Sequence, residues 1–116
     1  MADRLRILVV FSHPLADSLA GALKQAVIEG LETAGHTADL IDLYADDFDP
    51  RLSAAERAAF LQPGYTPPPD AAAYCDRLKA ADGLVFVFPQ WWFGMPAILK
   101  GFVDRVFVPG IAFDPD

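Results

Sequence analysis

The chain has 116 residues, of which 53% are hydrophobic and 22% charged, and its formal net charge is −7. This length suits one compact domain, and the apolar content is sufficient for a folded core and too high for a disordered chain. The acidic balance argues against general nucleic-acid binding and gives no attraction to anionic membranes. An anionic cofactor would therefore have to be held by local backbone N–H groups rather than by a basic surface.

The single cysteine, Cys75, excludes an internal disulfide and a metal site built from clustered cysteines, so we expect no metal centre. Near the N-terminus, the only apolar run covers residues 7–11. It is too short for a membrane span or for the apolar core of a signal peptide. We therefore expect a cytoplasmic protein without an integral membrane segment.

The first 44 residues predict a strand, a helix and a second strand. Residues 5–11 are apolar apart from Arg6, which is typical of a strand buried on both faces of a parallel sheet. Residues 19–34 have apolar side chains at helical spacing, and Asp17 or Ser18 can cap this helix. Residues 37–44 alternate, which completes a βαβ unit. The expected core face of the helix consists of Leu19, Leu23, Ala26, Val27, Leu31 and Ala34.

The rest of the chain predicts two helices, a strand and a last helix. In order, these elements span residues 53–61, 70–81, 83–88 and 96–107. Ser53 and Glu56 have the spacing of a capping box, and the Pro- and Gly-rich residues 62–69 indicate a surface loop. Pro96 can occupy the first turn of the last helix, where its missing N–H has no consequence.

Strands alternate with helices, which is the pattern of an α/β domain with a parallel sheet. Only three strands are predicted, and a parallel sheet of three strands is thin and leaves a hydrophobic edge exposed. We therefore expect a single domain, of which residues 1–116 form the N-terminal part. Its C-terminal strands would lie outside this chain.

Residues 12–18 follow the carboxyl end of the first strand, where open parallel sheets bind ligands. The segment offers the imidazole of His13, the hydroxyl of Ser18 and the free N–H groups of a helix N-terminus, which together favour a phosphate. It lacks both the G-x-G-x-x-G pattern and the Gly-Lys-Ser/Thr of nucleotide loops. The alternative is an ordinary capped helix start in which His13 only bonds to the backbone.

Residues 89–95 follow the last strand and contain Trp91, Trp92 and Phe93. Large aromatic side chains are normally buried unless a planar partner covers them. A flavin ring is such a partner, and backbone N–H groups of the same turn can bond its pyrimidine edge. The alternative is that Trp91 and Trp92 pack under the loop or in a dimer interface.

The order of these residues resembles the NAD(P)H:quinone oxidoreductase family. The similarity extends across essentially the whole chain and is most specific in its last third. The residues that carry it are 7–14, Ser18, 42–44 and the run 86–107, which includes Phe88-Pro89-Gln90-Trp91-Trp92-Phe93-Gly94-Met95-Pro96. The resemblance implies a flavodoxin-like fold, in which helices cover both faces of a parallel sheet in three α/β/α layers.

The resemblance also implies a homodimeric flavoprotein that accepts hydride from NAD(P)H and passes two electrons to a quinone or a related acceptor. The cofactor would be FAD, or FMN in some branches of the family. His13 and Ser18 would bind its phosphates, with Leu19 and Ala20 close by through their backbone. The residues expected around the flavin ring are Pro89, Gln90, Trp91, Trp92, Phe93 and Gly94.

Trp92 would also border the substrate pocket, and Phe113 matches a position near that pocket. The family often has Tyr where Phe113 stands and Asn where Ala20 stands, so the resemblance implies one hydrogen bond to substrate and one cofactor contact fewer here. The Gly-rich flavin loop of the family, and its Tyr and His near the flavin N1–C2=O edge, come later in the chain. We therefore expect the catalytic residues beyond Asp116, since His36 lies on the wrong stretch.

Two other functions compete with this one. The first is a flavodoxin-like accessory or regulatory subunit, such as those associated with potassium-efflux systems, whose main role is to bind a partner. The second is a non-catalytic fragment in which the aromatic loop only packs or dimerises.

Overall fold

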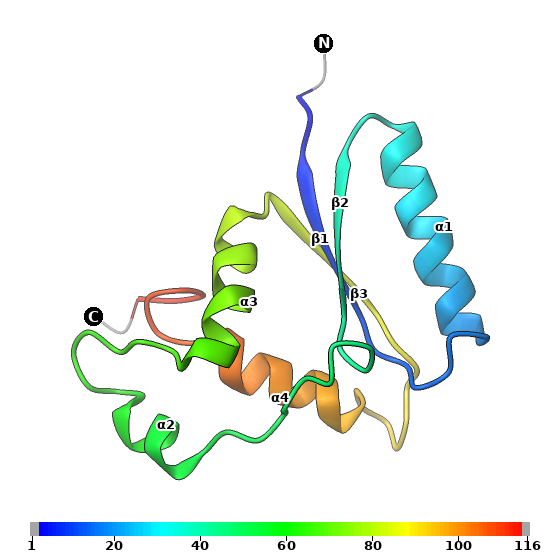
Figure 1. Ribbon diagram of the computed structural model, residues 1–116. Coiled ribbons are helices and arrows are strands. Elements are labelled where there is room, and N and C mark those ends of the chain that lie inside the picture. The colour runs from blue at the N-terminus through cyan, green and yellow to red at the C-terminus, as the bar shows by residue number, and fades with distance from the viewer. Residues whose placement is uncertain (1–2, 115–116) are drawn as a thin grey trace.

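The computed structural model describes residues 3–114, which form three strands and four helices (Figure 1). The strands are β1 (Arg6–Phe11), β2 (Thr37–Asp42) and β3 (Gly83–Val87). The helices are α1 (Leu19–Thr33), α2 (Ala54–Ala59), α3 (Pro69–Ala80) and α4 (Ala97–Val106). Every predicted element is present, and each boundary lies within two residues of the predicted one.

The strands form one parallel sheet in the order β2-β1-β3. β1 is therefore central, and its Val9 pairs with Leu40 of β2 on one side and with Val85 of β3 on the other. The last four residues of β1 are buried, which agrees with their continuous apolar sequence. The predicted α/β class with a parallel sheet is confirmed.

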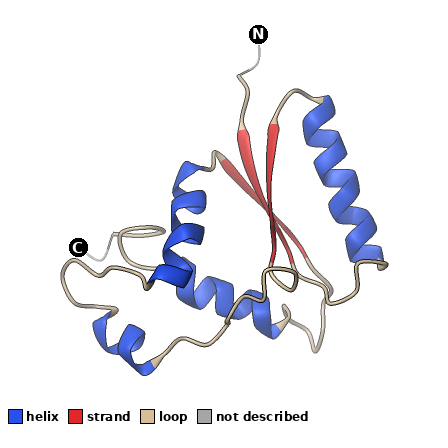
Figure 2. Cartoon of the chain, in the orientation of Figure 1, coloured by secondary structure: helices blue, strands red, loops and turns tan. Residues whose placement is uncertain are grey.

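Helices cover both faces of this sheet (Figure 2). On one face, α1 packs against Val9, Phe11 and Val87. The other face carries the larger core, in which Leu8 and Val10 of β1 meet side chains of α3 and α4. The predicted three-layer α/β/α arrangement is confirmed. No helix among residues 3–114 combines the length and the apolar character that crossing a membrane requires.

The helix starts follow the predicted caps, with one correction. Ser18 caps α1 by accepting a hydrogen bond from the N–H of Gly21 at 3.0 Å, and Ser53 and Glu56 form the predicted capping box. Pro96 stands at the N-cap of α4, with φ −57° and ψ 150°, rather than inside its first turn. The extended ψ of Pro96 places its carbonyl, which accepts from Leu99 and Lys100, at the entrance of the helix.

The predicted core face of α1 is wrong at its first turns. Leu19 is 79% exposed and Leu23 is 52% exposed, whereas Ala20 and Gly21 are buried. Small residues let the start of α1 approach its neighbours closely, and this rotates the two leucines toward solvent. Further along, the partly buried Leu31 packs on the sheet as predicted.

The β3 edge of the sheet is apolar and open within residues 3–114. β1 is the neighbour of β3 there, and Leu84, Phe86 and Phe88, which alternate along this segment, are each 37–39% exposed. This is the hydrophobic edge that the sequence predicts for a three-strand sheet. The expectation that residues 1–116 are the N-terminal part of a domain remains a prediction.

Arg105, near the end of α4, connects α4 to three other segments of the chain. Its guanidinium is 4% exposed and donates to Glu56 Oε2 at 3.0 Å, to both Asp70 oxygens at 2.8 and 2.9 Å, and to the Asp49 carbonyl at 2.8 Å. It also lies over the ring of Phe48, 5.6 Å from the centroid. One buried cation therefore ties α2, α3 and the segment after β2 to α4.

Backbone packing reinforces this anchor where α4 crosses the segment after β2. A Cβ built on Gly101 would lie 2.3 Å from the carbonyl oxygen and the Cβ of Pro50. Only glycine permits this approach, since a contact of that length with backbone cannot be relieved by rotating a side chain.

The ion pairs also shift the pKa values of their members. Hydrogen bonding from Arg105 is the main cause that lowers the pKa of Asp70. Burial tends to raise the pKa of Glu56, but hydrogen bonds from Ser53 and Arg105 outweigh it and lower the pKa below its usual value. Both carboxylates therefore bind protons more weakly in the folded chain than in the unfolded one.

We predict that Arg105→Met lowers the free energy of unfolding by roughly 3–5 kcal/mol, because Glu56 is left buried without its partner. In the wild type, the free energy of unfolding should fall as the pH drops below the reference pKa values of 4.5 for Glu56 and 3.8 for Asp70. Urea denaturation at several pH values measures both effects.

The matched control is Arg51→Met, because Arg51 is 86% exposed in its pair with Asp49. Losing an exposed ion pair should leave the free energy of unfolding almost unchanged. An Arg105→Met variant as stable as this control, with the acid sensitivity of the wild type, would contradict the role assigned to Arg105.

Candidate functional site

The two loops singled out in the sequence leave the same edge of the sheet, at the bottom of Figure 1. They are the β1–α1 loop (residues 12–18) and the aromatic turn (residues 89–95). The N–H of Ser12 donates to the carbonyl of Val87 at 3.1 Å, which extends the β1–β3 pairing by one residue and holds the loops side by side. Further out, the rings of His13 and Trp91 meet edge to face, with centroids 5.8 Å apart. The structure therefore brings the two predicted halves of the site together.

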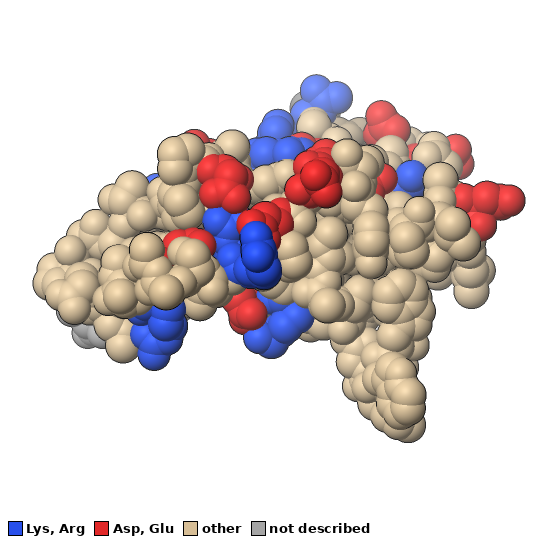
Figure 3. Space-filling model, turned by 60° about the horizontal axis from the view of Figure 1, so that its bottom comes forward, with Lys and Arg blue, Asp and Glu red and all other residues tan. Residues whose placement is uncertain are grey.

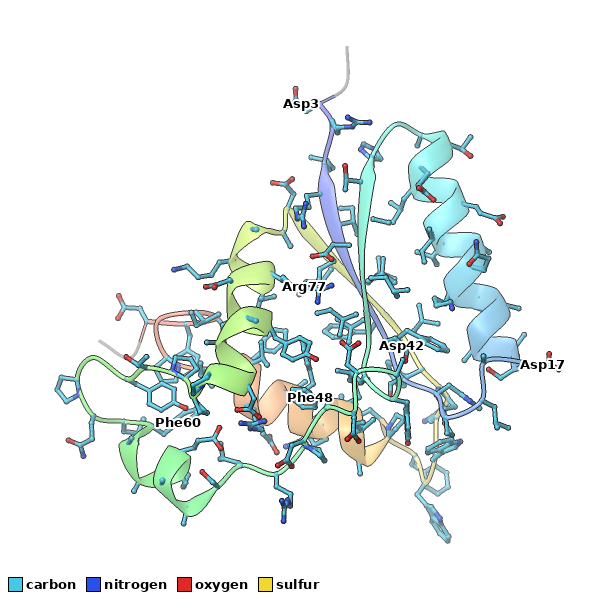
Figure 4. All side chains as sticks on the ribbon, in the orientation of Figure 1. Asp3, Asp17, Asp42, Phe48, Phe60 and Arg77 are labelled. Atoms are coloured by element: carbon cyan, nitrogen blue, oxygen red, sulfur yellow. The ribbon has the colours of Figure 1, made fainter. Side chains whose placement is uncertain are left out.

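The start of α1 presents donors for an anion. The N–H groups of Leu19 and Ala20 lie in the first helical turn, where no intrahelical acceptor exists. The first turn contains no acidic residue, and Asp17, just before it, extends away from the sheet (Figure 4). The Ser18 oxygen accepts from Gly21, and its O–H remains able to donate. This donor set suits a phosphate group.

The half-buried His13 adds a side-chain donor to this set. Its Nδ1 accepts a hydrogen bond from the N–H of Leu15 at 2.9 Å. A neutral imidazole that accepts at Nδ1 has its proton on Nε2, so Nε2 is a donor. His13 bonds to the backbone as the alternative interpretation states, but that bond occupies one nitrogen and orients the other for a ligand.

The aromatic turn is a tight hairpin. The backbones of Trp91 and Gly94 exchange two hydrogen bonds of 3.1 Å, and the residues between them, Trp92 and Phe93, have φ values of 51° and 60°. Their side chains are 95% and 91% exposed. Figure 3 shows the projection at this end of the molecule, which has no Lys, Arg, Asp or Glu on it. The idea that Trp92 packs under the loop is therefore wrong.

This turn is unfavourable in two ways. A left-handed backbone costs about 1–2 kcal/mol for a residue with a side chain, and bulky residues adopt it only as outliers. Exposure of a large apolar side chain also forgoes about 1.5–3 kcal/mol that burial would contribute. Backbone strain of this kind concentrates at ligand clamps and active sites. A planar ligand over Trp92 and Phe93 would restore the burial that both rings lack.

Other predicted site residues lie around or away from this pair of loops. Pro89 and Gln90 form the base of the turn, next to β3. Phe113 lies beyond the far end of α4, with its ring 6.5 Å from that of Phe60. Because the 10 residues of α4 span about 15 Å, one copy of the chain does not bring Phe113 to Trp92.

His36 lies at the opposite end of the sheet from both loops. Its Nδ1 accepts from the N–H of Leu5, just before β1, at 3.1 Å. This agrees with the sequence-based exclusion of His36 from the site.

Sequence reasoning missed the roles of Gly21, in the first turn of α1, and of Ser12, in the β1–α1 loop. A Cβ on Gly21 would lie 2.2 Å from the carbonyl oxygen of Ala16, so glycine is needed for the loop to fold back on the helix. A signal was available, since glycine is unfavourable inside a helix by about 1 kcal/mol. Ser12 is fully buried, and within residues 3–114 its hydroxyl has no hydrogen-bond partner.

We predict that Gly21→Ala displaces the β1–α1 loop, lowers the free energy of unfolding by roughly 1–3 kcal/mol and weakens binding of phosphate-containing ligands. Gly30→Ala is the matched control on the same helix, since nothing lies within 4 Å of its added Cβ. Replacing this helical glycine should raise stability by up to about 1 kcal/mol. Thermal and urea denaturation measure the stability of both variants. An equal change in the free energy of unfolding in the two variants would refute the close contact at Gly21.

Comparisons with known proteins agree with this geometry. A family model described as a flavodoxin-like fold matches residues 5–116. A ribosyldihydronicotinamide dehydrogenase-like protein of Penicillium crustosum is 38% identical over 122 residues, covering 91% of this chain and 45% of the relative. NAD(P)H dehydrogenase (quinone) 1 of Cavia porcellus is 35% identical over 128 residues, covering 97% of this chain and 46% of the relative.

Among solved structures, an NAD(P)H:quinone oxidoreductase from Methanothermobacter marburgensis matches with a TM-score of 0.87 and 35% identity. The match covers 91% of this chain and 55% of that one. The chain thus spans about half the length of the relatives that it matches. The resemblance stated from the sequence is confirmed, and the chain belongs to the flavodoxin-like family that includes the NAD(P)H:quinone oxidoreductases.

Proposed function

We propose that the protein is a flavin-dependent NAD(P)H oxidoreductase that reduces quinones or related acceptors by two-electron hydride transfer. The observation that carries the proposal is the aromatic turn, in which Trp92 and Phe93 are strained and almost fully exposed beside a loop of anion donors. The names of the relatives, which include quinone dehydrogenases that use NAD(P)H, support the same reaction class.

The residues present fit a flavin nucleotide in both of its parts. His13 Nε2, the Ser18 hydroxyl and the N–H groups of Leu19 and Ala20 would hold phosphate oxygens. Backbone donors suit this task because a chain of net charge −7 does not attract anions through its overall charge. We propose FAD as the cofactor and FMN as the alternative, since a single phosphate at this loop would serve either molecule.

The aromatic turn would hold the ring system. Trp92 and Phe93 would cover its apolar area, with Pro89, Gln90 and Gly94 at its edge. Trp91 would lie away from the ring, against His13. A bound flavin would supply the hydride-transfer chemistry, which amino-acid side chains do not provide. The protein contributes binding, orientation and exclusion of water. Nicotinamide and acceptor would occupy one pocket in turn, bordered by Trp92, which would give ping-pong kinetics.

Three further parts of this proposal concern the whole protein. The catalytic residues would lie beyond Asp116. The protein would be a homodimer, because α4 separates Trp92 from Phe113 and a pocket that uses both residues requires a second copy. It would act in the cytoplasm, in agreement with the short apolar run at residues 7–11.

Absorbance spectra of the protein mixed with FAD or FMN, followed by gel filtration, test flavin binding directly. We expect retained yellow protein that oxidises NADH or NADPH when a quinone is present. Protein that retains neither flavin would refute the proposal. Protein that retains flavin without turning over quinones would favour the accessory-subunit alternative.

We predict that Trp92→Gly weakens flavin binding by about 2- to 12-fold, because an aromatic contact worth roughly 0.5–1.5 kcal/mol is lost. Its free energy of unfolding should stay equal or rise by up to about 1 kcal/mol, since glycine accepts φ 51° and the replaced side chain is 95% exposed. Flavin titration and urea denaturation measure the two effects.

Asp47→Gly is the matched control, because Asp47 also has φ 51° but lies outside both loops. It should gain stability without losing flavin affinity. Loss of stability in Trp92→Gly, with flavin affinity unchanged, would show that the tryptophan is a packing residue.

A further inference from the structure

We propose that Trp91 is a positioning residue that holds the imidazole of His13 in its phosphate-binding orientation, so that the aromatic turn and the β1–α1 loop act as one unit. The inference rests on the proposed function, because it assigns the His13 donor to the phosphate of a flavin nucleotide. It changes the expected role of Trp91, which acts through His13 rather than on the flavin ring.

The contacts of His13 show why it needs a second support. The bond from the Leu15 N–H to Nδ1, at 2.9 Å, comes from the same loop, only two residues away. That bond selects the nitrogen that carries the proton, but it moves with the loop. The ring of Trp91, edge to face at 5.8 Å and 62°, is the aromatic contact that reaches His13 from another part of the chain. It therefore defines where the imidazole lies relative to the aromatic turn.

Trp91 differs from the two aromatic residues that follow it. Its side chain is 42% exposed, compared with 95% for Trp92 and 91% for Phe93. Among residues 3–114, Trp91 does not have a positive φ, whereas the two residues that follow it, Trp92 and Phe93, do. The turn thus presents two rings outward and directs the third toward His13. Trp91 therefore contacts the β1–α1 loop, whereas Trp92 and Phe93 remain available to a ligand.

The backbone that carries Trp91 is well fixed. Its N–H and carbonyl both bond to Gly94 at 3.1 Å, and the buried Pro96 begins α4 two residues later. At the base of the loops, the Ser12 N–H donates to the Val87 carbonyl at 3.1 Å. The contact between His13 and Trp91 is therefore a second connection between two segments that are already joined at their origin. Loss of the indole would release the imidazole without separating the loops.

A role of Trp91 through His13 affects ligands with a phosphate differently from ligands without one. FMN has a phosphate for His13 to bind, whereas riboflavin has the same ring system without a phosphate. If Trp91 acts through His13, its removal affects FMN and leaves riboflavin unchanged. If Trp91 instead stacks on the flavin, its removal weakens both ligands to the same degree.

The first experiment titrates FMN and riboflavin into the wild type, Trp91→Leu, His13→Ala and the double variant. We expect Trp91→Leu to weaken FMN by about 2- to 12-fold, the range of a single aromatic pair, with riboflavin unchanged. The double variant should bind FMN no more weakly than His13→Ala does, because both changes remove the same interaction. Trp91→Phe, which retains an aromatic ring, should restore most of the affinity.

Equal weakening of FMN and riboflavin by Trp91→Leu would overturn the proposal, as would additive losses in the double variant or full FMN affinity in Trp91→Leu. Urea denaturation of each variant shows whether a loss of binding reflects a loss of folded protein.

The second experiment needs no ligand. The 15N chemical shifts of the imidazole nitrogens report which nitrogen carries the proton, and the ring-proton shifts of His13 report the nearby indole. Trp91→Leu should change the ring-proton shifts of His13, whereas Trp92→Leu, in the neighbouring exposed position, should not. Unchanged His13 shifts in Trp91→Leu would overturn the positioning role.

The two experiments distinguish the possible failures. A wild type that binds neither FMN nor riboflavin would refute the proposed function and, with it, the assignment of His13 to a phosphate. The His13 shifts test the contact itself in either case.

Discussion

The parallel pairing of β1 on both of its sides is the constraint on which the rest of this structure depends. Because β2 and β3 run in the same direction as β1, the carboxyl ends of all three strands lie at one edge of the sheet. The Ser12 N–H then donates to the Val87 carbonyl, one residue beyond the paired strands. Two loops that are distant in the sequence therefore begin side by side, and a ligand larger than either loop can contact both.

The aromatic turn of the candidate site is energetically unfavourable, and it depends on the rigid elements on either side of it. Trp92 and Phe93 combine a left-handed backbone with nearly complete exposure. Such a turn persists only where neighbouring structure fixes its ends. One end follows β3, and the other enters α4, where the buried Arg105 bonds to Glu56 of α2 and Asp70 of α3. Stability in the core thus compensates for strain at the edge.

The sequence predicted the elements well because their signals are local. The apolar runs of the strands, the Ser53–Glu56 capping box and the Ser18 cap each depend on residues close together in the chain. Predictions failed where long-range packing decides the outcome. Leu19 has helical periodicity, but the close approach of Gly21 to Ala16 turns it outward. The approach of Trp91 to His13 depends on strand order and turn geometry, which no local pattern encodes.

The central claim is that the β1–α1 loop and the aromatic turn form one flavin-nucleotide site. The most direct test follows the backbone amide resonances of Leu19 and Ala20, and the indole resonances of Trp91 and Trp92, as FMN is added. We expect both groups of resonances to shift with the same midpoint concentration, because one molecule contacts both loops. Shifts confined to one loop, different midpoints for the two groups, or shifts centred elsewhere on the sheet would contradict the account.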